Sequence, residues 1–221
     1  MIPDVLRALR QTFSPPFRRV LWISLALALV TLFVLGVILQ TALGYLPQFA
    51  SAYLNAGIDI LLRFFAVIVL IPLVFPVTTL VAAFFLESMA GKVEAEDYPA
   101  DPAGRDQPFL QSLIVGLRFT AILIVVNICA LPFYLLPGVN LIMFWAVNGY
   151  LLGREYFELV ALRHLSPSET RVLRKSHRLR IFLSGVLVAL FASVPLLNLA
   201  APLFGTAFLV HTYKRLAHAP G

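Results

Sequence analysis

The sequence predicts an all-α membrane protein with two long transmembrane helices, two re-entrant helical hairpins that penetrate part of the bilayer, and a basic amphipathic helix on the cytoplasmic side. Composition is the first observation: 60% of the 221 residues are hydrophobic and 13% are charged, whereas a soluble domain carries about 25% charged residues. The second is the presence of long charge-free runs, which cover residues 20–58, 64–86, 119–152 and 181–213. Because a helical span needs roughly 20 apolar residues, the chain is predicted to cross the membrane several times.

The N-terminal segment 1–16 is predicted to form a short amphipathic helix on the membrane surface. Its apolar residues Leu6, Leu9 and Phe13 recur at helical spacing among arginines, which is typical of an interfacial helix. The pair Pro15-Pro16 ends this segment, because proline cannot continue a helix. The first span is predicted over residues 17–43.

The next elements are a connection, a second span and a loop. Residues 44–59 are polar and aromatic, and the second span is predicted over 60–87, interrupted by Pro72 and Pro76. Residues 88–118 are hydrophilic and rich in acidic residues, proline and glycine, which predicts a cytoplasmic loop.

The two charge-free runs 119–152 and 181–213 predict helical hairpins that turn inside the bilayer. The prolines that divide the two runs are Pro132, Pro137, Pro195 and Pro202. Halves of about 13 residues reach roughly 20 Å, whereas the hydrocarbon core is about 30 Å thick. Residues 119–152 are therefore predicted as hairpin one and residues 181–213 as hairpin two. The alternative is that each run forms two complete spans. The segments before and after the run would then lie on the same side of the membrane, as they do with a re-entrant hairpin.

The basic segment 154–180 predicts the orientation of the chain. It carries seven Lys or Arg residues against three Glu, and with the N-terminus on the same side it gives a positive-inside arrangement with a cytoplasmic N-terminus. Ser166-Pro167-Ser168-Glu169 is a capping-box pattern, so we expect a short helix over about 167–180 whose basic face lies on anionic headgroups.

No catalytic, cofactor, metal or nucleic-acid motif is present in the sequence. It contains no P-loop, HExxH or GxSxG pattern, so we predict neither an enzyme nor a cofactor. The single cysteine Cys129 excludes a cysteine-based metal site, and the four histidines lack ligand spacing. The basic segments also lack the interleaved aromatic residues of a nucleic-acid platform.

Paired apolar segments that proline and glycine interrupt are typical of transport sites, because a break inside the membrane frees backbone groups that lipid cannot satisfy. The candidate path-lining residues are Asn127, Asn140, Asn148 and Asn198. Alternatively, these amides bond neighbouring helices or cap turns. The acidic residues near predicted membrane edges are Asp59, Glu87, Glu155 and Glu158. Of these, Glu87 and Glu158 are the candidates for proton coupling, with simple solvation at the interface as the alternative.

Arg18 and Arg19 stand at the start of the first predicted span. Two arginines in this place can mark the cytoplasmic interface. They can also capture an oxyanion, because each guanidinium offers a planar fork of donors next to the amides of a starting helix.

Three segments stand out in their order along the chain: Pro15-Pro16-Phe17-Arg18-Arg19, Pro137-Gly138 and Pro195-Leu196-Leu197-Asn198-Leu199. In sequence and spacing they resemble motifs of the CysZ-type sulfate transporter family of bacterial inner membranes. The family's Tyr-x-Asp-Tyr-Pro motif is reduced here to Tyr156 and an acid, Glu158, and its Ala-Ala-Pro-Phe is replaced by Ala82-Ala83-Phe84-Phe85.

The resemblance implies a sulfate permease of the inner membrane that feeds cysteine synthesis and assembles as a homo-oligomer. It implies a site for sulfate or a related oxyanion at Phe17, Arg18 and Arg19. Pro16 replaces the family's glycine and has no amide N–H to donate. The alternative hypothesis is a membrane-shaping or scaffold protein, in which the hairpins wedge into one leaflet and hold no ion path.

Overall fold

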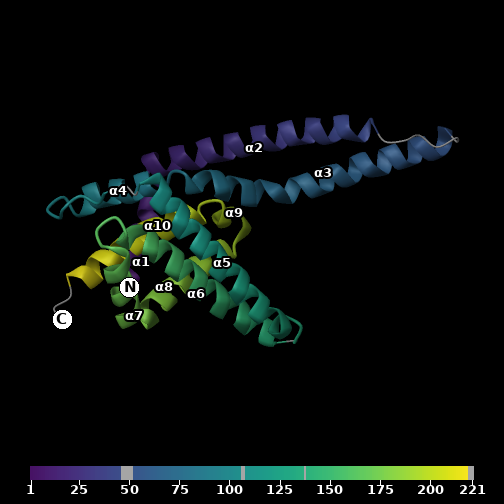
Figure 1. Cartoon of the computed structure of the whole chain (residues 1–221). Helices are drawn as coiled ribbons and strands as arrows, with labels where there is room; N and C mark the ends of the chain where they lie inside the picture. The colour runs from purple at the N-terminus through teal and green to yellow at the C-terminus, as the bar shows by residue number, and fades with distance from the viewer. Residues whose placement is uncertain (46–51, 106–107, 137, 219–221) are drawn as a thin grey trace. The chain divides into compact units, whose positions relative to one another are not determined.

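The computed structural model describes residues 1–45, 52–105, 108–136 and 138–218, and this part of the chain is helical, with no strand (Figure 1). It divides into two compact units. One unit comprises Met1–Arg18 and Phe85–Gly221, and the other comprises Arg19–Phe84. The all-helical prediction is thus confirmed for the described residues.

The smaller unit consists of two long antiparallel helices, which Figure 1 shows side by side. They are α2 (Pro15–Leu43), whose first residues belong to the other unit, and α3 (Ala52–Ala83). A Cβ placed on Gly36 of α2 would lie 3.4 Å from Cδ1 of Leu70. Nearer the turn, Arg63 Nη1 donates to Gln40 Oε1 (2.9 Å). These contacts fix the register of the pair.

The α2 helix has one buried stripe and is otherwise covered by exposed apolar side chains. The buried stripe recurs every fourth residue, at Val20, Ser24, Ala28 and Leu32. Elsewhere on the helix large apolar residues such as Trp22 and Phe33 are exposed. Pro15–Ala42 is long and apolar enough to cross a membrane, and lipid is the solvent in which such exposure carries no cost.

The second predicted span differs from α3 in its bounds and in its continuity. The prediction was 60–87, but α3 runs from Ala52 to Ala83 and continues through Pro72 and Pro76. It therefore measures roughly 48 Å at 1.5 Å per residue. Of the predicted connection 44–59, residues 46–51 lie outside the described part of the chain.

The larger unit is built around α10 (Ala201–Ala217), which is buried along most of its length. The helices that pack on it are α1 (Ile2–Thr12), α4 (Leu86–Asp97), α6 (Val139–Ala161) and α8 (Arg178–Ala192). At its start Phe204 stacks on Phe191 of α8, with ring centroids 4.4 Å apart. The core of this unit is therefore apolar at the start of α10 and, as described below, polar near its end.

Helix α1 confirms the helix predicted at the N-terminus. Its polar residues Asp4 and Gln11 are buried, and Asp4 pairs with Arg215 of α10. Its apolar residues Leu6 and Phe13 are exposed. The exposed apolar face supports the prediction that this helix lies on a membrane surface.

Helices α6 and α8 cross in close contact because glycines occupy the crossing. A Cβ on Gly185 of α8 would collide with the backbone of Gly149 and Gly153 on α6. A Cβ on Gly153 would likewise collide with the Ile181 carbonyl. Glycines four residues apart let helix backbones approach closely in membranes, so this crossing depends on the absence of three side chains.

Hairpin one is present as α5 (Phe109–Tyr134) and α6, joined by a turn with Gly138 at φ +82°; Pro137 lies outside the described residues. The predicted halves were too short. Pro132 lies inside α5, near its end, where the missing N–H removes one hydrogen bond without stopping the helix. Leu117–Tyr134 is long and apolar enough to cross a membrane.

Hairpin two is present as α8, the short α9 (Pro195–Asn198) and α10. Pro195 and Pro202 were predicted to divide this run, and they stand in the first turns of α9 and α10. With 15 and 17 residues, α8 and α10 measure roughly 22 and 25 Å, less than the hydrocarbon core of about 30 Å. Partial penetration of the membrane stays a prediction for both hairpins.

The predicted cytoplasmic loop 88–118 is wrong as a loop, since α4 and the first turns of α5 occupy most of it. The buried residues Leu86, Met89, Ala90 and Val93 have helical spacing, a signal that the acidic composition obscured. The capping box is confirmed at α7 (Pro167–Ser176), where Ser166 accepts from the Glu169 amide. The predicted helix 167–180 is interrupted at His177, and α8 begins at Arg178.

Candidate functional site

The predicted sulfate-binding residues stand at the start of α2. Phe17 is buried, and Arg18 and Arg19 are exposed. Pro15 and Pro16 have no amide N–H, and the Arg18 amide donates to the Ser14 carbonyl (2.9 Å). Of the first four residues of the helix, only Phe17 can thus offer its amide to an anion. The two guanidinium groups would have to supply most of the donors at such a site.

A polar hollow of about 510 Å³ lies between α1 and α4. Its charged lining residues are Arg7, Arg10, Glu96 and Asp97. Asp97 also accepts a hydrogen bond from Gln11 Nε2 (2.8 Å). Because two acids balance the two arginines, the hollow has no excess positive charge for an anion.

Three of the four candidate path-lining asparagines form side-chain hydrogen bonds within their own helices. Asn127 on α5 donates to the Leu123 carbonyl (2.9 Å), and Asn148 on α6 donates to the Phe144 carbonyl (2.8 Å). Asn140 Oδ1 accepts from the amide of the next residue, and Asn198 lies half-buried in α9. The bonds of Asn127 and Asn148 lie within their own helices rather than between neighbouring helices, and a path along the four asparagines stays a prediction.

The two acids proposed for proton coupling have different surroundings. Glu87 lies half-buried on α4, and its backbone carbonyl accepts from Arg163 Nη1 (3.2 Å). Glu158 on α6 accepts from Arg154 Nε (2.9 Å) and lies 3.2 Å from Arg174 Nε. Glu158 thus forms ion pairs with two arginines, and proton coupling at Glu87 or Glu158 stays a prediction. The side chain of Asp59 lies outside the described residues.

Glu155 is a further acid near the predicted membrane edge, and its carboxyl has a raised pKa. Burial raises the pKa of this carboxyl to about 7, because desolvation disfavours the charged form. The residue follows the apolar part of α6, next to Arg154. A carboxyl with this pKa can exchange a proton near neutral pH.

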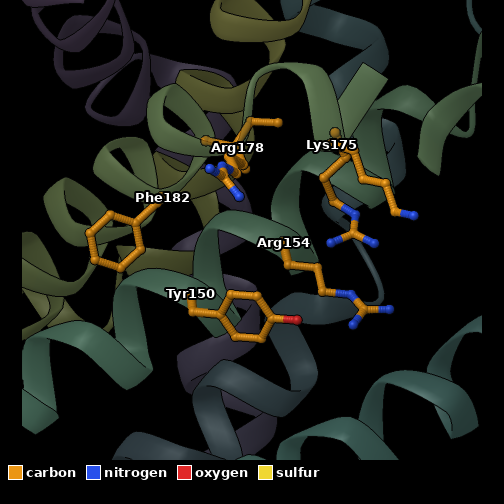
Figure 2. Close-up of a pocket in the computed structure, with 7 residues that line it drawn as sticks. Tyr150, Arg154, Lys175, Arg178 and Phe182 are labelled. Carbon is orange, nitrogen blue, oxygen red and sulfur yellow. The ribbon is translucent and has the colours of Figure 1, made fainter. Parts of the chain in front are cut away.

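A basic pocket of about 400 Å³ lies between α6, α7 and α8 (Figure 2). The pocket is lined by Tyr150, Arg154, Arg174, Lys175, Arg178, Ile181 and Phe182. Figure 2 shows the charged ends of Arg154 and Lys175 on one side and the Phe182 ring on the other. The pocket therefore combines a cationic wall with an apolar one.

An inner hollow of about 50 Å³ adjoins the basic pocket and shares Arg154 and Arg174 with it. The inner hollow is lined by Arg118, Arg154, Glu158, Leu162, Pro167, Thr170, Arg171 and Arg174. The sequence predicted that this basic segment would face lipid headgroups. It gave no signal that Arg118 of α5 would join the cluster.

Buried polar contacts hold α4 against α6. Glu94 Oε1 lies 2.9 Å from His164 Nε2, and Glu94 Oε2 lies 3.3 Å from Arg163 Nη2. Burial works against the charge of Glu94, but the hydrogen bonds from His164 and Arg163 outweigh it and lower the pKa to about 2. Glu94 is therefore a structural anion.

A second polar cluster holds α1 and α4 against the end of α10. His211 is buried, with Nδ1 2.9 Å from the Tyr98 hydroxyl and Nε2 2.9 Å from Gln11 Oε1. Lys214 Nζ pairs with Asp101 Oδ2 (3.0 Å). These contacts join segments at opposite ends of the sequence, so sequence reasoning could not find them.

Apolar helices that expose their side chains and are long enough to cross a bilayer, with basic clusters at their ends, define a polytopic helical membrane protein. The profile of the family described as "Sulfate transporter CysZ/Etoposide-induced protein 2.4" matches residues 4–202. This covers most of the 221 residues, and the chain belongs to that family. The resemblance inferred from the sequence motifs is thereby confirmed. Comparison with curated protein sequences gives no significant match.

Proposed function

We propose that the protein is an inner-membrane permease for sulfate or a related tetrahedral oxyanion, which supplies sulfate for assimilation into cysteine. Family membership supports this proposal, because the family description names a sulfate transporter. The observation that carries it in this chain is the pair Arg18 and Arg19, exposed at the start of an apolar helix long enough to cross the bilayer. Planar guanidinium groups match the geometry of such an anion.

The proposed anion site depends on side chains more than on backbone amides. Pro15 and Pro16 remove two of the donors that a helix start normally offers an anion. We therefore propose that Arg18 and Arg19 hold the anion and that Phe17, which is buried, anchors the start of the helix. The interrupted helices near Asn140 and Asn198 remain the proposed path.

Uptake of sulfate requires a source of free energy. Moving two negative charges inward against 100 mV, inside negative, costs about 4.6 kcal/mol. A steep gradient, rapid consumption of sulfate or coupling to protons can offset this cost. We propose Glu155 for the coupling step, since its pKa of about 7 lets it bind and release a proton near neutral pH.

The proposal is tested by labelled sulfate uptake into proteoliposomes that contain the full chain. We expect the double variant Arg18→Ala/Arg19→Ala to reduce uptake by more than about tenfold, because each charged hydrogen bond contributes about 1.5–3 kcal/mol. The matched control is Lys92→Ala/Arg105→Ala, which also removes one charge from each of two exposed positions and should transport at the wild-type rate. Protease protection verifies that each variant inserts.

Each outcome of this experiment has a distinct meaning. Uptake that survives in the inserted double variant would place the anion elsewhere and leave Arg18 and Arg19 as markers of topology. No sulfate uptake by the wild-type chain would contradict the permease proposal. Tubulation of the same liposomes without any anion flux would instead favour a membrane-shaping role.

A further inference from the structure

We propose that the basic pocket and its inner hollow form a second binding site, for a tetrahedral oxyanion group such as a phosphate or sulfate. The residues of this site come from α5, α6, α7 and α8, whereas Phe17, Arg18 and Arg19 begin α2. The group could be the head of an anionic lipid or a free ion. The inference does not depend on the permease proposal.

The first argument is an excess of positive charge. The cations that line the two cavities are Arg118, Arg154, Arg171, Arg174, Lys175 and Arg178. Glu158 is the one acid among the lining residues, and it already pairs with Arg154 and Arg174. Cations at this density repel one another, and an oxyanion with one or two negative charges would offset that repulsion.

The second argument is a pair of buried donors that have no hydrogen-bond acceptor. Thr170 lines the inner hollow, its side chain is 2% exposed, and its Oγ1 has no partner among the described residues. Nε of Arg174 is also buried, and it lies 3.2 Å from Glu158 outside hydrogen-bonding geometry. Leaving a buried donor unpaired costs about 1–3 kcal/mol. A bound oxyanion would provide acceptors for both.

The third argument is the shape of the site. The inner hollow, about 50 Å³, has room for one small oxyanion, while the outer pocket is about 400 Å³. Tyr150, Ile181 and Phe182 give that outer pocket an apolar wall, which suits the glycerol and first acyl carbons of a lipid. Anionic lipid heads gather where basic residues flank a membrane. The bound oxyanion group could therefore belong to a lipid head or be a free ion.

The two sources are separated with the full chain in nanodiscs. In one arm, nanodiscs of phosphatidylcholine with some phosphatidylglycerol are analysed by native mass spectrometry, which counts the phosphatidylglycerol retained. In the other arm, nanodiscs of phosphatidylcholine alone are unfolded by heat with sodium phosphate, sulfate or chloride at equal ionic strength. The first arm reports a lipid head and the second a free oxyanion.

The variants are Lys175→Gln/Arg178→Gln and Thr170→Val, with Lys92→Gln/Arg105→Gln as the charge-matched control. We expect the first variant to weaken binding by about tenfold or more, since two charged donors are lost. Thr170→Val preserves the shape and charge of the site and removes one donor, so a several-fold loss is expected. The control should bind as the wild type does.

The outcomes either identify the source or overturn the proposal. Retention of phosphatidylglycerol that the pocket variants lose identifies a lipid head. A rise in unfolding temperature with phosphate or sulfate over chloride, lost in the same variants, identifies a free ion. The proposal is overturned if both pocket variants retain phosphatidylglycerol and respond to phosphate or sulfate as the wild type does. It is also overturned if the control variant loses binding to the same extent as the pocket variants. If the double variant fails to fold, Thr170→Val alone decides.

Discussion

Glu94 is a buried carboxylate, and its partners Arg163 and His164 lie almost seventy residues later in the chain. Its oxygens also accept from the Gly104 amide (3.3 Å), so one side chain joins α4, the following turn and the end of α6. A buried anion with this number of donors is stabilising only while all of its partners are present. Glu94 is therefore a position where we expect a single substitution to have a large effect.

The replacement Glu94→Gln is expected to lower the free energy of unfolding by about 3 kcal/mol at neutral pH, because it leaves the Arg163 charge buried without its partner. The lowered pKa sets the pH dependence. The stability from this carboxylate is present above the ordinary value of 4.5 and is lost as the pH falls toward about 2. Thermal unfolding in detergent, measured as a function of pH, should show the wild type and the variant converging in acid.

The control for this substitution is Glu96→Gln, on the exposed side of the same helix. It removes the same charge without breaking a buried pair, so we expect a change of less than about 1 kcal/mol. A constant difference between the wild type and Glu94→Gln from neutral to acid pH would mean that the ion pair does not contribute to stability.

At the scale of elements, the crossing of α6 and α8 depends on glycine. Gly149 and Gly153 on α6 face Gly185 on α8, and their backbones are too close to admit a Cβ. A Cβ added to any of these glycines would push α6 and α8 apart. Helix α10, which packs on both, would then lose contacts as well. The same separation would also distort the basic pocket, since Arg154 directly follows Gly153 and Ile181 lies one turn before Gly185.

We expect Gly185→Ala to lower the free energy of unfolding by about 3 kcal/mol, because the added methyl group overpacks a backbone contact. Chemical unfolding in mixed micelles measures the change. The matched control is Gly57→Ala on α3, where a Cβ meets nothing within 4 Å. In a helix this exchange should instead be stabilising by up to about 1 kcal/mol. If both variants unfold alike, the close crossing is not a source of stability.

At the scale of the whole molecule, the depth to which hairpin one enters the bilayer stays a prediction, and two arginines bear on it. From Arg118 to the end of α5 the charge-free part is 119–134, and on α6 it is 139–152 before Arg154. These parts measure roughly 24 and 21 Å, which is less than the hydrocarbon core of about 30 Å. Leu117–Tyr134 is by itself a candidate span, whereas the lengths of the charge-free parts predict a turn inside the membrane, so a direct test of topology is needed.

Cysteine labelling in whole cells tests this topology in a Cys129→Ser background. We expect Tyr45→Cys to react with a membrane-impermeant maleimide from outside, and Ser168→Cys to react only after permeabilisation, as the positive-inside rule requires. Leu136→Cys, at the turn of hairpin one, should be protected from both sides. Labelling of Leu136→Cys from outside would show that α5 and α6 cross the membrane completely.

The sequence by itself determined the class of protein, the start of α7 at its capping box, and the family. These properties depend on composition and local spacing, as in the capping box at Ser166 and the turn between α5 and α6. Such local patterns form without contacts from distant parts of the chain. Only the tertiary structure showed that the predicted loop 88–118 contains a helix, because the apolar face of α4 is stabilised by packing on α10.

Tertiary structure alone also decided which charges meet. Glu94 and Arg163 are far apart in the chain and meet because α4 packs against α6. Arg118 and Arg174 are also distant in the chain, and they line one hollow because α5 and α7 both pack on α6. No local pattern encodes such a meeting, since each partner is an ordinary charged residue in its own segment. The candidate anion site at Arg18 and Arg19 was readable from a motif, whereas the basic pocket exists only in the folded chain.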